Sequence, residues 1–265
     1  MAKEPLDALP LWLLFATLCA LAALALEGGY RLGRWRRARS EEEEKETPVG
    51  AMVGSILALF AFLLAFTFGM AASRFEARRE TVLEEANAIG TAYLRTRLIP
   101  EPQRGESARL LREYVDVRLT AIQRGELEAA IARSEEIHTL LWAQAAQAAD
   151  KDRGPIMGLY IQSLNQMIDL HAKRLQVGLR NRIPETIWAG LGGIALLAML
   201  SVGYQAGLAA TRRSPAMLGV VVAFATVLTL IADLDRAYSG LITVSQQSLV
   251  DLQKSINGAE HPPVN

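Results

Sequence analysis

The stretch Val49–Arg79, VGAMVGSILALFAFLLAFTFGMAASRFEARR, decides the fold, because an apolar run passes directly into a charged segment. The run is uncharged up to Ala72, and about 20 apolar residues in a helix cross the hydrocarbon layer of a bilayer. Charged residues then alternate with apolar ones such as Phe75 and Val82 at helical spacing. The stretch therefore predicts one helix that crosses a membrane and continues beyond it to about Ile99.

One face of this predicted span has polar residues at its ends and phenylalanines in its middle. Steps of three and four residues place on that face Ser55, Leu59, Phe62, Phe66, Gly69 and Ser73. A pore helix repeated about an axis has this character, with hydroxyl groups at the mouths and a hydrophobic constriction between them. Contact with lipid or with a neighbouring helix is the simpler interpretation of the two phenylalanines, and the residues alone favour it.

Three further apolar runs have membrane-spanning length, Leu9–Leu26, Ile187–Ala210 and Met217–Ala232. A cleaved secretory signal is the alternative for the first run, but the arginine-rich segment 31–39 follows it directly and resists translocation. With 51% hydrophobic residues among 265, the composition fits a polytopic membrane protein. Four spans place both termini and the long segment between the second and third spans on one side of the membrane.

The segment between the second and third spans is amphipathic helix throughout, so the predicted fold class is all-α, with a helical extramembrane domain. Residues 28–47 are expected to form a solvated loop, with an acidic run at 40–46, and residues 211–215 a tight basic turn. The domain organisation predicted is 1–72 for the first two spans, 73–184 for the helical domain, 185–236 for the last two spans and 237–265 for an amphipathic tail.

The composition and motifs exclude several classes of function. Lys and Arg number 28, as do Asp and Glu, so no basic surface for nucleic acid is expected. The single cysteine, Cys19, cannot form an internal disulfide. His138 and His171 lie on different predicted helices without metal-ligand spacing, and a structural role is the favoured interpretation of both. No catalytic residue, metal site, cofactor or enzymatic activity is predicted.

Charged residues mark the membrane interface at the ends of two spans. Asp233, Asp235 and Arg236 follow the fourth span, and Arg74 follows the second. Charge at this depth must be paired or solvated. Two interpretations stay open: an interfacial boundary in which Arg236 pairs with the aspartates, or a cation-attracting ring at a pore mouth or a lock between subunits.

Several motifs together resemble a known family. Phe62-Leu-Leu-Ala-Phe66, followed by Arg74-Phe75, resembles the pore helix of the bestrophin ion channels, and the four spans with a large helical segment after the second also match. Residues 84–90, EEANAIG, and Asp233-Leu-Asp235-Arg236 with Gly240 are similar to the bestrophin-like domain family of bacterial membrane proteins. The likeness covers roughly residues 50–252.

This resemblance implies a homo-oligomeric channel for small ions, with five copies around a pore lined by the second span, and it shifts the interpretation of Phe62 and Phe66 to pore-facing. A non-conducting helical sensor or scaffold in the membrane is the alternative. Basic residues in the short loops place the helical domain outside the cell, but arginines at the opposite ends of the spans balance them. The resemblance implies the inner membrane, with the domain in the cytosol.

Overall fold

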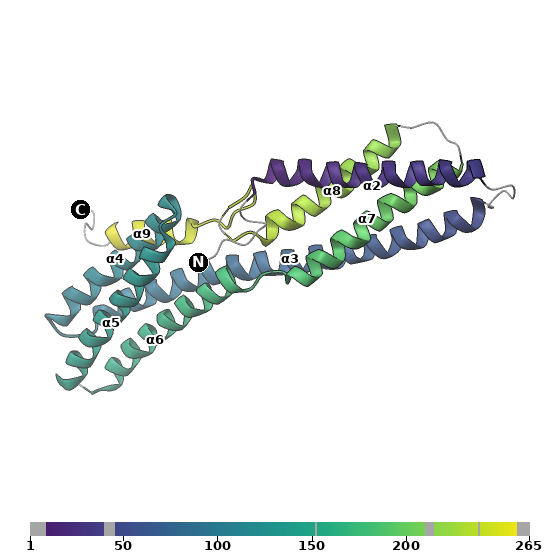
Figure 1. Ribbon diagram of the computed structural model, residues 1–265. Coiled ribbons are helices and arrows are strands. Elements are labelled where there is room, and N and C mark those ends of the chain that lie inside the picture. The colour runs from purple at the N-terminus through teal and green to yellow at the C-terminus, as the bar shows by residue number, and fades with distance from the viewer. Residues whose placement is uncertain (1–8, 40–45, 152, 210–214, 238, 259–265) are drawn as a thin grey trace. The chain divides into compact units, whose positions relative to one another are not determined.

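The computed structural model of the protein describes residues 9–39, 46–151, 153–209, 215–237 and 239–258 (Figure 1). Most of the predicted acidic run and most of the basic turn lie outside these residues. The described residues form helices and contain no β-strand, which confirms the all-α prediction. The helices are α2 (Leu11–Arg39), α3 (Glu46–Thr96), α4 (Gln103–Arg124), α5 (Leu127–Lys151), α6 (Pro155–Leu175), the π-helix η1 (Gln176–Arg180), α7 (Glu185–Leu208), α8 (Pro215–Asp235) and α9 (Gln247–Gly258).

The chain divides into two compact units. We call Met1–Phe75 with Arg182–Thr243 the membrane unit, and Glu76–Asn181 with Val244–Asn265 the extramembrane unit. The two units meet after Phe75 and before Arg182, within a few residues of the predicted domain limits at 72/73 and 184/185. They also divide the C-terminal tail, because its residues from Val244 onward belong to the extramembrane unit.

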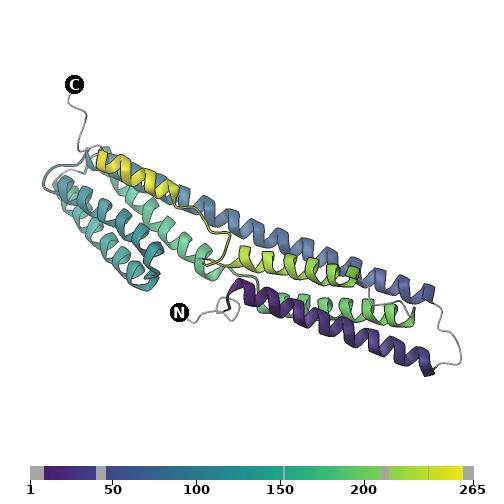
Figure 2. The same ribbon diagram turned by 90° about the horizontal axis from the view of Figure 1, so that it is seen from above.

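The membrane unit consists of α2, the first part of α3, α7 and α8, which lie side by side (Figures 1 and 2). Within the described residues, four helical segments are long and apolar enough to cross a membrane. Their shared core includes Phe60, Met199, Val221 and Ile231. The chain is therefore a multi-pass membrane protein whose helices contact lipid.

The closest helix pair in this unit is held by four glycines. A Cβ atom on Gly203 would overlap the Leu26 carbonyl oxygen, and one on Gly29 would overlap the Leu200 carbonyl oxygen. Gly33 and Gly207 meet the facing backbone in the same way. Small residues four apart let membrane helices approach backbone to backbone. The residue numbers of the contacting pairs increase along both helices, from Gly29 with Leu200 to Gly33 with Tyr204. Helices α2 and α7 therefore run parallel.

The prediction of a loop that begins at residue 28 is wrong, because α2 continues as a helix to Arg39. Gly28 and Gly29 are absorbed into a helix whose glycine face is buried against α7. Glycine weakens an isolated helix by about 1 kcal/mol, but tertiary packing compensates at a site where only glycine fits. The basic residues of this segment, including Arg37, which donates 2.8 Å to the Leu208 carbonyl oxygen, therefore belong to the last turns of α2.

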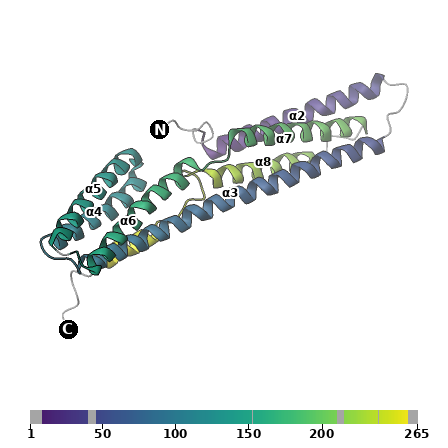
Figure 3. The same ribbon diagram turned by 90° about the horizontal axis from the view of Figure 1, so that it is seen from below.

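The prediction of one continuous helix after the second span is confirmed, because α3 runs over 51 residues from Glu46 to Thr96. Its part from Glu76 onward packs with α4, α5, α6 and α9 in the extramembrane unit (Figure 3). Tyr114, Tyr160 and Leu141 are fully buried in the core of that unit. Gly125, with φ of 70°, takes the left-handed conformation that ends α4. The C-terminal helix α9 contributes Leu249 to the same core.

Candidate functional site

The predicted pore-facing residues share one uncovered face of α3. Ser55, Leu59, Phe62, Phe66, Gly69 and Ser73 are all exposed in the single chain. Phe62 is 67% exposed and Phe66 62%, so no other described part of this chain covers either ring. The face carries no charged side chain between Ser55 and Ser73. Such a face meets lipid, a second chain or a pore.

The opposite face of α3 packs inside the membrane unit. Phe60 is fully buried, and its ring lies 4.8 Å from that of Phe224, measured between centroids. Thr67 is also buried, and its hydroxyl donates 2.7 Å to the Leu63 carbonyl oxygen. Thr67 therefore adds nothing polar to the uncovered face, whose hydroxyls are those of Ser55 and Ser73.

Asp233 closes the turn after α8. Its carboxylate accepts hydrogen bonds of 3.0 Å from the backbone amides of Leu241 and Ile242. Gly240 precedes these amides with φ of 141°, and a Cβ there would overlap Asp233 Oδ1. Only glycine fits this backbone conformation beside the carboxylate. With 3% of its surface exposed, Asp233 is a structural cap for the turn.

Asp235 joins three segments of the membrane unit. Its Oδ1 accepts a 3.1 Å hydrogen bond from the Ile183 amide and lies 3.9 Å from Arg74 Nη1. Arg182 lies 3.9 Å from Oδ2 and donates to the Asp235 carbonyl oxygen. The Asp235 side chain is buried among these groups.

Arg236 reaches a different segment, because its Nη2 donates 2.6 Å to the Leu9 carbonyl oxygen. The structure thus brings Arg74, Asp235 and Arg182 together and holds Asp233 and Arg236 by backbone groups. Burial of both aspartates favours the interpretation of a structural boundary over that of an exposed cation-attracting ring. Arg182 also belongs to this cluster, but its position two residues after the end of η1 does not predict a pairing with Asp235.

A second charged cluster lies in the core of the extramembrane unit, around the fully buried Glu85 of α3. Arg118 Nε of α4 is 3.2 Å from Glu85 Oε1, and Arg174 of α6 donates to Oε2. Tyr114 of α4 donates a 2.9 Å hydrogen bond to Oε1. Arg174 also donates 2.9 Å to Oε1 of Gln246, which precedes α9. One carboxylate therefore connects α3, α4 and α6, and through Arg174 the segment before α9.

His138 and His171 converge beside this carboxylate. Their ring centroids are 4.9 Å apart in an edge-to-face arrangement, and His171 Nδ1 lies 3.2 Å from the Tyr114 hydroxyl oxygen. Because that hydroxyl donates to Glu85, His171 Nδ1 carries the proton and donates to Tyr114. The Nε2 atoms of both histidines are buried and have no hydrogen-bond partner among the described residues.

The electrostatics of this cluster fix its charge state. Burial alone raises the pKa of Glu85, but Arg174 and Arg118 outweigh it and hold the pKa below its ordinary value. Burial and Arg118 lower the pKa of His138 to about 4, against the opposing effect of Glu85. Burial, Arg118 and His138 lower that of His171 to about 4. At neutral pH the cluster holds one carboxylate, two guanidinium groups and two neutral imidazoles.

The arrangement is suited to holding helices together. Within the described residues no three His, Cys, Asp or Glu side chains are placed to hold a metal ion. Glu84, the neighbour of Glu85, is exposed and lies 2.6 Å from Lys173 Nζ. Successive residues of a helix point to different faces, so the sequence separates these two glutamates, but it does not bring Glu85 together with the histidines.

The fold defines the class of protein. It is an all-α membrane protein with four spans, in which the second span continues into a helical domain outside the membrane. A comparison with protein families matches residues 15–249 to the Bestrophin-like domain. The chain belongs to this family. Neither the curated proteins nor the solved structures contain a match to it.

Proposed function

We propose that the chain assembles as a homo-oligomer, a pentamer by resemblance to bestrophins, and conducts small ions through a pore lined by α3, without enzymatic activity. Membership of the Bestrophin-like domain family supports this function, because bestrophins are ion channels. The observation that carries the proposal is the uncovered face of α3, where Leu59, Phe62 and Phe66 are all more than half exposed.

Assembly follows from the number of spans. Four spans in one chain are too few to enclose a pore, so a conducting path requires several copies of α3 around an axis. In that arrangement Phe62 and Phe66 form two apolar rings, which offer an ion no replacement for its hydration shell. The rings therefore restrict conduction, and the Ser55 and Ser73 hydroxyls lie toward the two ends of the path.

Flux from reconstituted liposomes tests the role of these rings. Replacement of both Phe62 and Phe66 by alanine widens the path and is expected to raise ion flux. Phe68 lies on another face of α3 and is 38% exposed, so Phe68→Ala is the matched control and should leave flux unchanged. Phe60 is unsuitable as a control, because its removal would leave a cavity in the core.

Two outcomes would reject the proposal. A monodisperse monomer in mild detergent would contradict the assembly, and a rise in flux for Phe68→Ala but not for the double variant would contradict the pore-facing assignment. An oligomer that shows no ion flux, either as the unaltered protein or as the double variant, would favour the non-conducting scaffold.

We further propose that the protein resides in the inner membrane with its extramembrane unit in the cytosol, as the resemblance implies. A cysteine introduced at Gly105, in a variant that lacks Cys19, reports the orientation. It should resist a membrane-impermeant thiol reagent in intact cells and react after permeabilisation. Reaction in intact cells would place the unit outside.

A further inference from the structure

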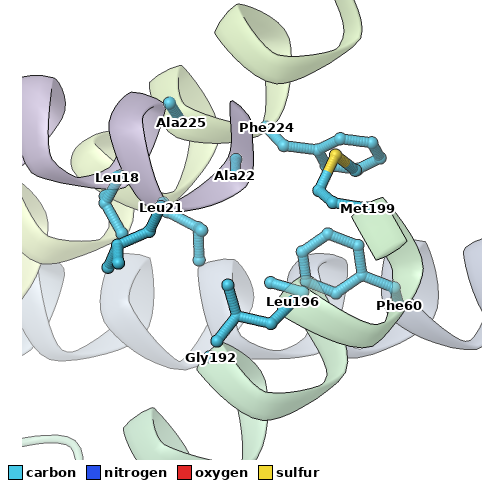
Figure 4. A pocket seen from close by; sticks show the side chains of 11 residues that line it. Leu18, Leu21, Ala22, Phe60, Gly192, Leu196, Met199, Phe224 and Ala225 are labelled. Atoms are coloured by element: carbon cyan, nitrogen blue, oxygen red, sulfur yellow. The ribbon is translucent and has the colours of Figure 1, made fainter. Parts of the chain in front are cut away.

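An apolar pocket of about 90 Å³ lies inside the membrane unit, between all four of its helices (Figure 4). Side chains from α2, α3, α7 and α8 converge on it, among them Leu18, Leu21, Phe60, Gly192, Leu196 and Phe224. Every lining residue is apolar. A water molecule in such a pocket would lack the two to four polar partners that it needs.

The pocket lies at the centre of the predicted spans. Phe60 is midway along the run 49–72, Met199 along 187–210 and Phe224 along 217–232. Equal depth on three helices places the pocket near the middle of the bilayer. The ends of the lipid acyl chains lie at this depth, while headgroups and water are farthest away.

The rim of the pocket faces outward. Leu21 of α2 is 46% exposed and Leu196 of α7 is 42% exposed, although both contribute to the lining. Where this rim faces the bilayer, the medium next to it is hydrocarbon. The pocket is therefore accessible to the acyl chains of the surrounding lipids, which are present at high concentration.

We propose that this pocket binds the distal end of a membrane-lipid acyl chain. An empty apolar pocket forfeits van der Waals contacts on its whole lining, and a hydrocarbon chain restores them without leaving any polar group unpaired. Aromatic rings of Phe60 and Phe224 form one wall, and the missing side chain of Gly192 provides the space opposite. The occupant thus supports the back of α3, on the face away from Phe62 and Phe66.

Photolabelling in nanodiscs tests the proposal on the full-length protein. Two phosphatidylcholine probes are compared, one with a diazirine near the end of an acyl chain and one with a diazirine near the headgroup. After irradiation, mass spectrometry of peptides locates the labelled residues. The distal probe is expected to label Leu18, Leu21 and Phe224 more strongly than Leu197, which is 59% exposed and does not line the pocket. The headgroup-proximal probe should not label the pocket.

A matched pair of variants distinguishes labelling by a lipid bound in the pocket from labelling by bulk lipid. A Cβ on Gly192 or on Gly193 would meet no other described segment within 4 Å, so both positions accept a larger side chain, but only Gly192 lines the pocket. Gly192→Leu fills the space and should reduce pocket labelling to the level of bulk contact. Gly193→Leu should leave it unchanged.

Each contrary result overturns the inference. Equal labelling of the pocket by the two probes, pocket labelling no stronger than that of Leu197, or unchanged labelling in Gly192→Leu would show that no acyl chain occupies the site. The comparison of the two probes uses the unaltered protein, so it decides the question even if Gly192→Leu fails to fold. The readout is lipid occupancy and does not depend on ion conduction.

Discussion

Replacement of Glu85 by alanine is expected to destabilise the extramembrane unit strongly. The change leaves the guanidinium groups of Arg118 and Arg174 buried without their carboxylate and removes the acceptor of the Tyr114 hydroxyl. Breaking a buried ion pair by removing one partner costs about 3–5 kcal/mol. For a chain of this size, a loss of 1 kcal/mol in the free energy of unfolding lowers Tm by about 2–4 °C, so Tm should fall by about 10 °C.

Intrinsic fluorescence measures this change in the right unit. Trp142 is the one tryptophan in the sequence of the extramembrane unit, so a background with phenylalanine at the other tryptophans reports on that unit alone. The neighbouring Glu84→Ala is the control. Glu84 is exposed and its pair with Lys173 contributes at most about 1 kcal/mol. If the two variants lower Tm equally, the argument from the buried carboxylate is wrong.

Acidification should also destabilise this unit, because His138 and His171 have a pKa of about 4 in the fold and about 6.5 when unfolded. The unfolded chain then binds more protons, so stability present above pH 6.5 is lost as the pH falls through about 4, by up to about 3 kcal/mol for each histidine. Tm measured against pH should decline more steeply for the unaltered protein than for His138→Phe, and equal slopes would contradict the assignment. In the membrane unit, Gly203→Ile should separate α2 from α7 and lower stability by about 3 kcal/mol, whereas Gly193→Ile has open space and should be neutral. Thermal stability in detergent distinguishes the two variants, and matching melting temperatures would refute the close contact.

The spans were predictable from the sequence because they depend on local composition. Uncharged runs of sufficient length identify α3, α7 and α8, and their predicted ends lie within a few residues of the helix ends. The continuation of α3 beyond the membrane was predictable for a similar reason, since apolar residues keep their helical spacing after Ser73 and no proline interrupts them before Pro100.

The course of α2 was not predictable from local signals. Gly28 and Gly29, followed by charged residues, have the composition of a loop. The structure makes them helical because Gly29 and Gly33 meet the backbone of α7, more than 160 residues away in sequence. Gly203 and Gly207 lie four residues apart, a spacing found in close-packed pairs of membrane helices, but this spacing does not identify the partner helix.

The cluster around Glu85 shows a similar limit. Helical spacing assigns Glu85, His138 and His171 each to a face of its own helix, yet it does not say which faces meet. Packing of α3, α4, α5 and α6 in one core brings the three residues together. A buried carboxylate of this kind could have been sought from its position among Val82, Ala86 and Ile89, which lie on the buried face of α3.

The parallel pair of α2 and α7 also limits how the membrane unit can change shape. Backbone touches backbone at two successive turns of each helix, so a rotation of either helix would drive Leu200 or Tyr30 into the other main chain. Sliding by one residue would place a side chain where only a hydrogen fits. We therefore expect the two helices to move together as one rigid pair. Any relative motion of the helices in this unit is then expected to displace α3 or α8 against that pair.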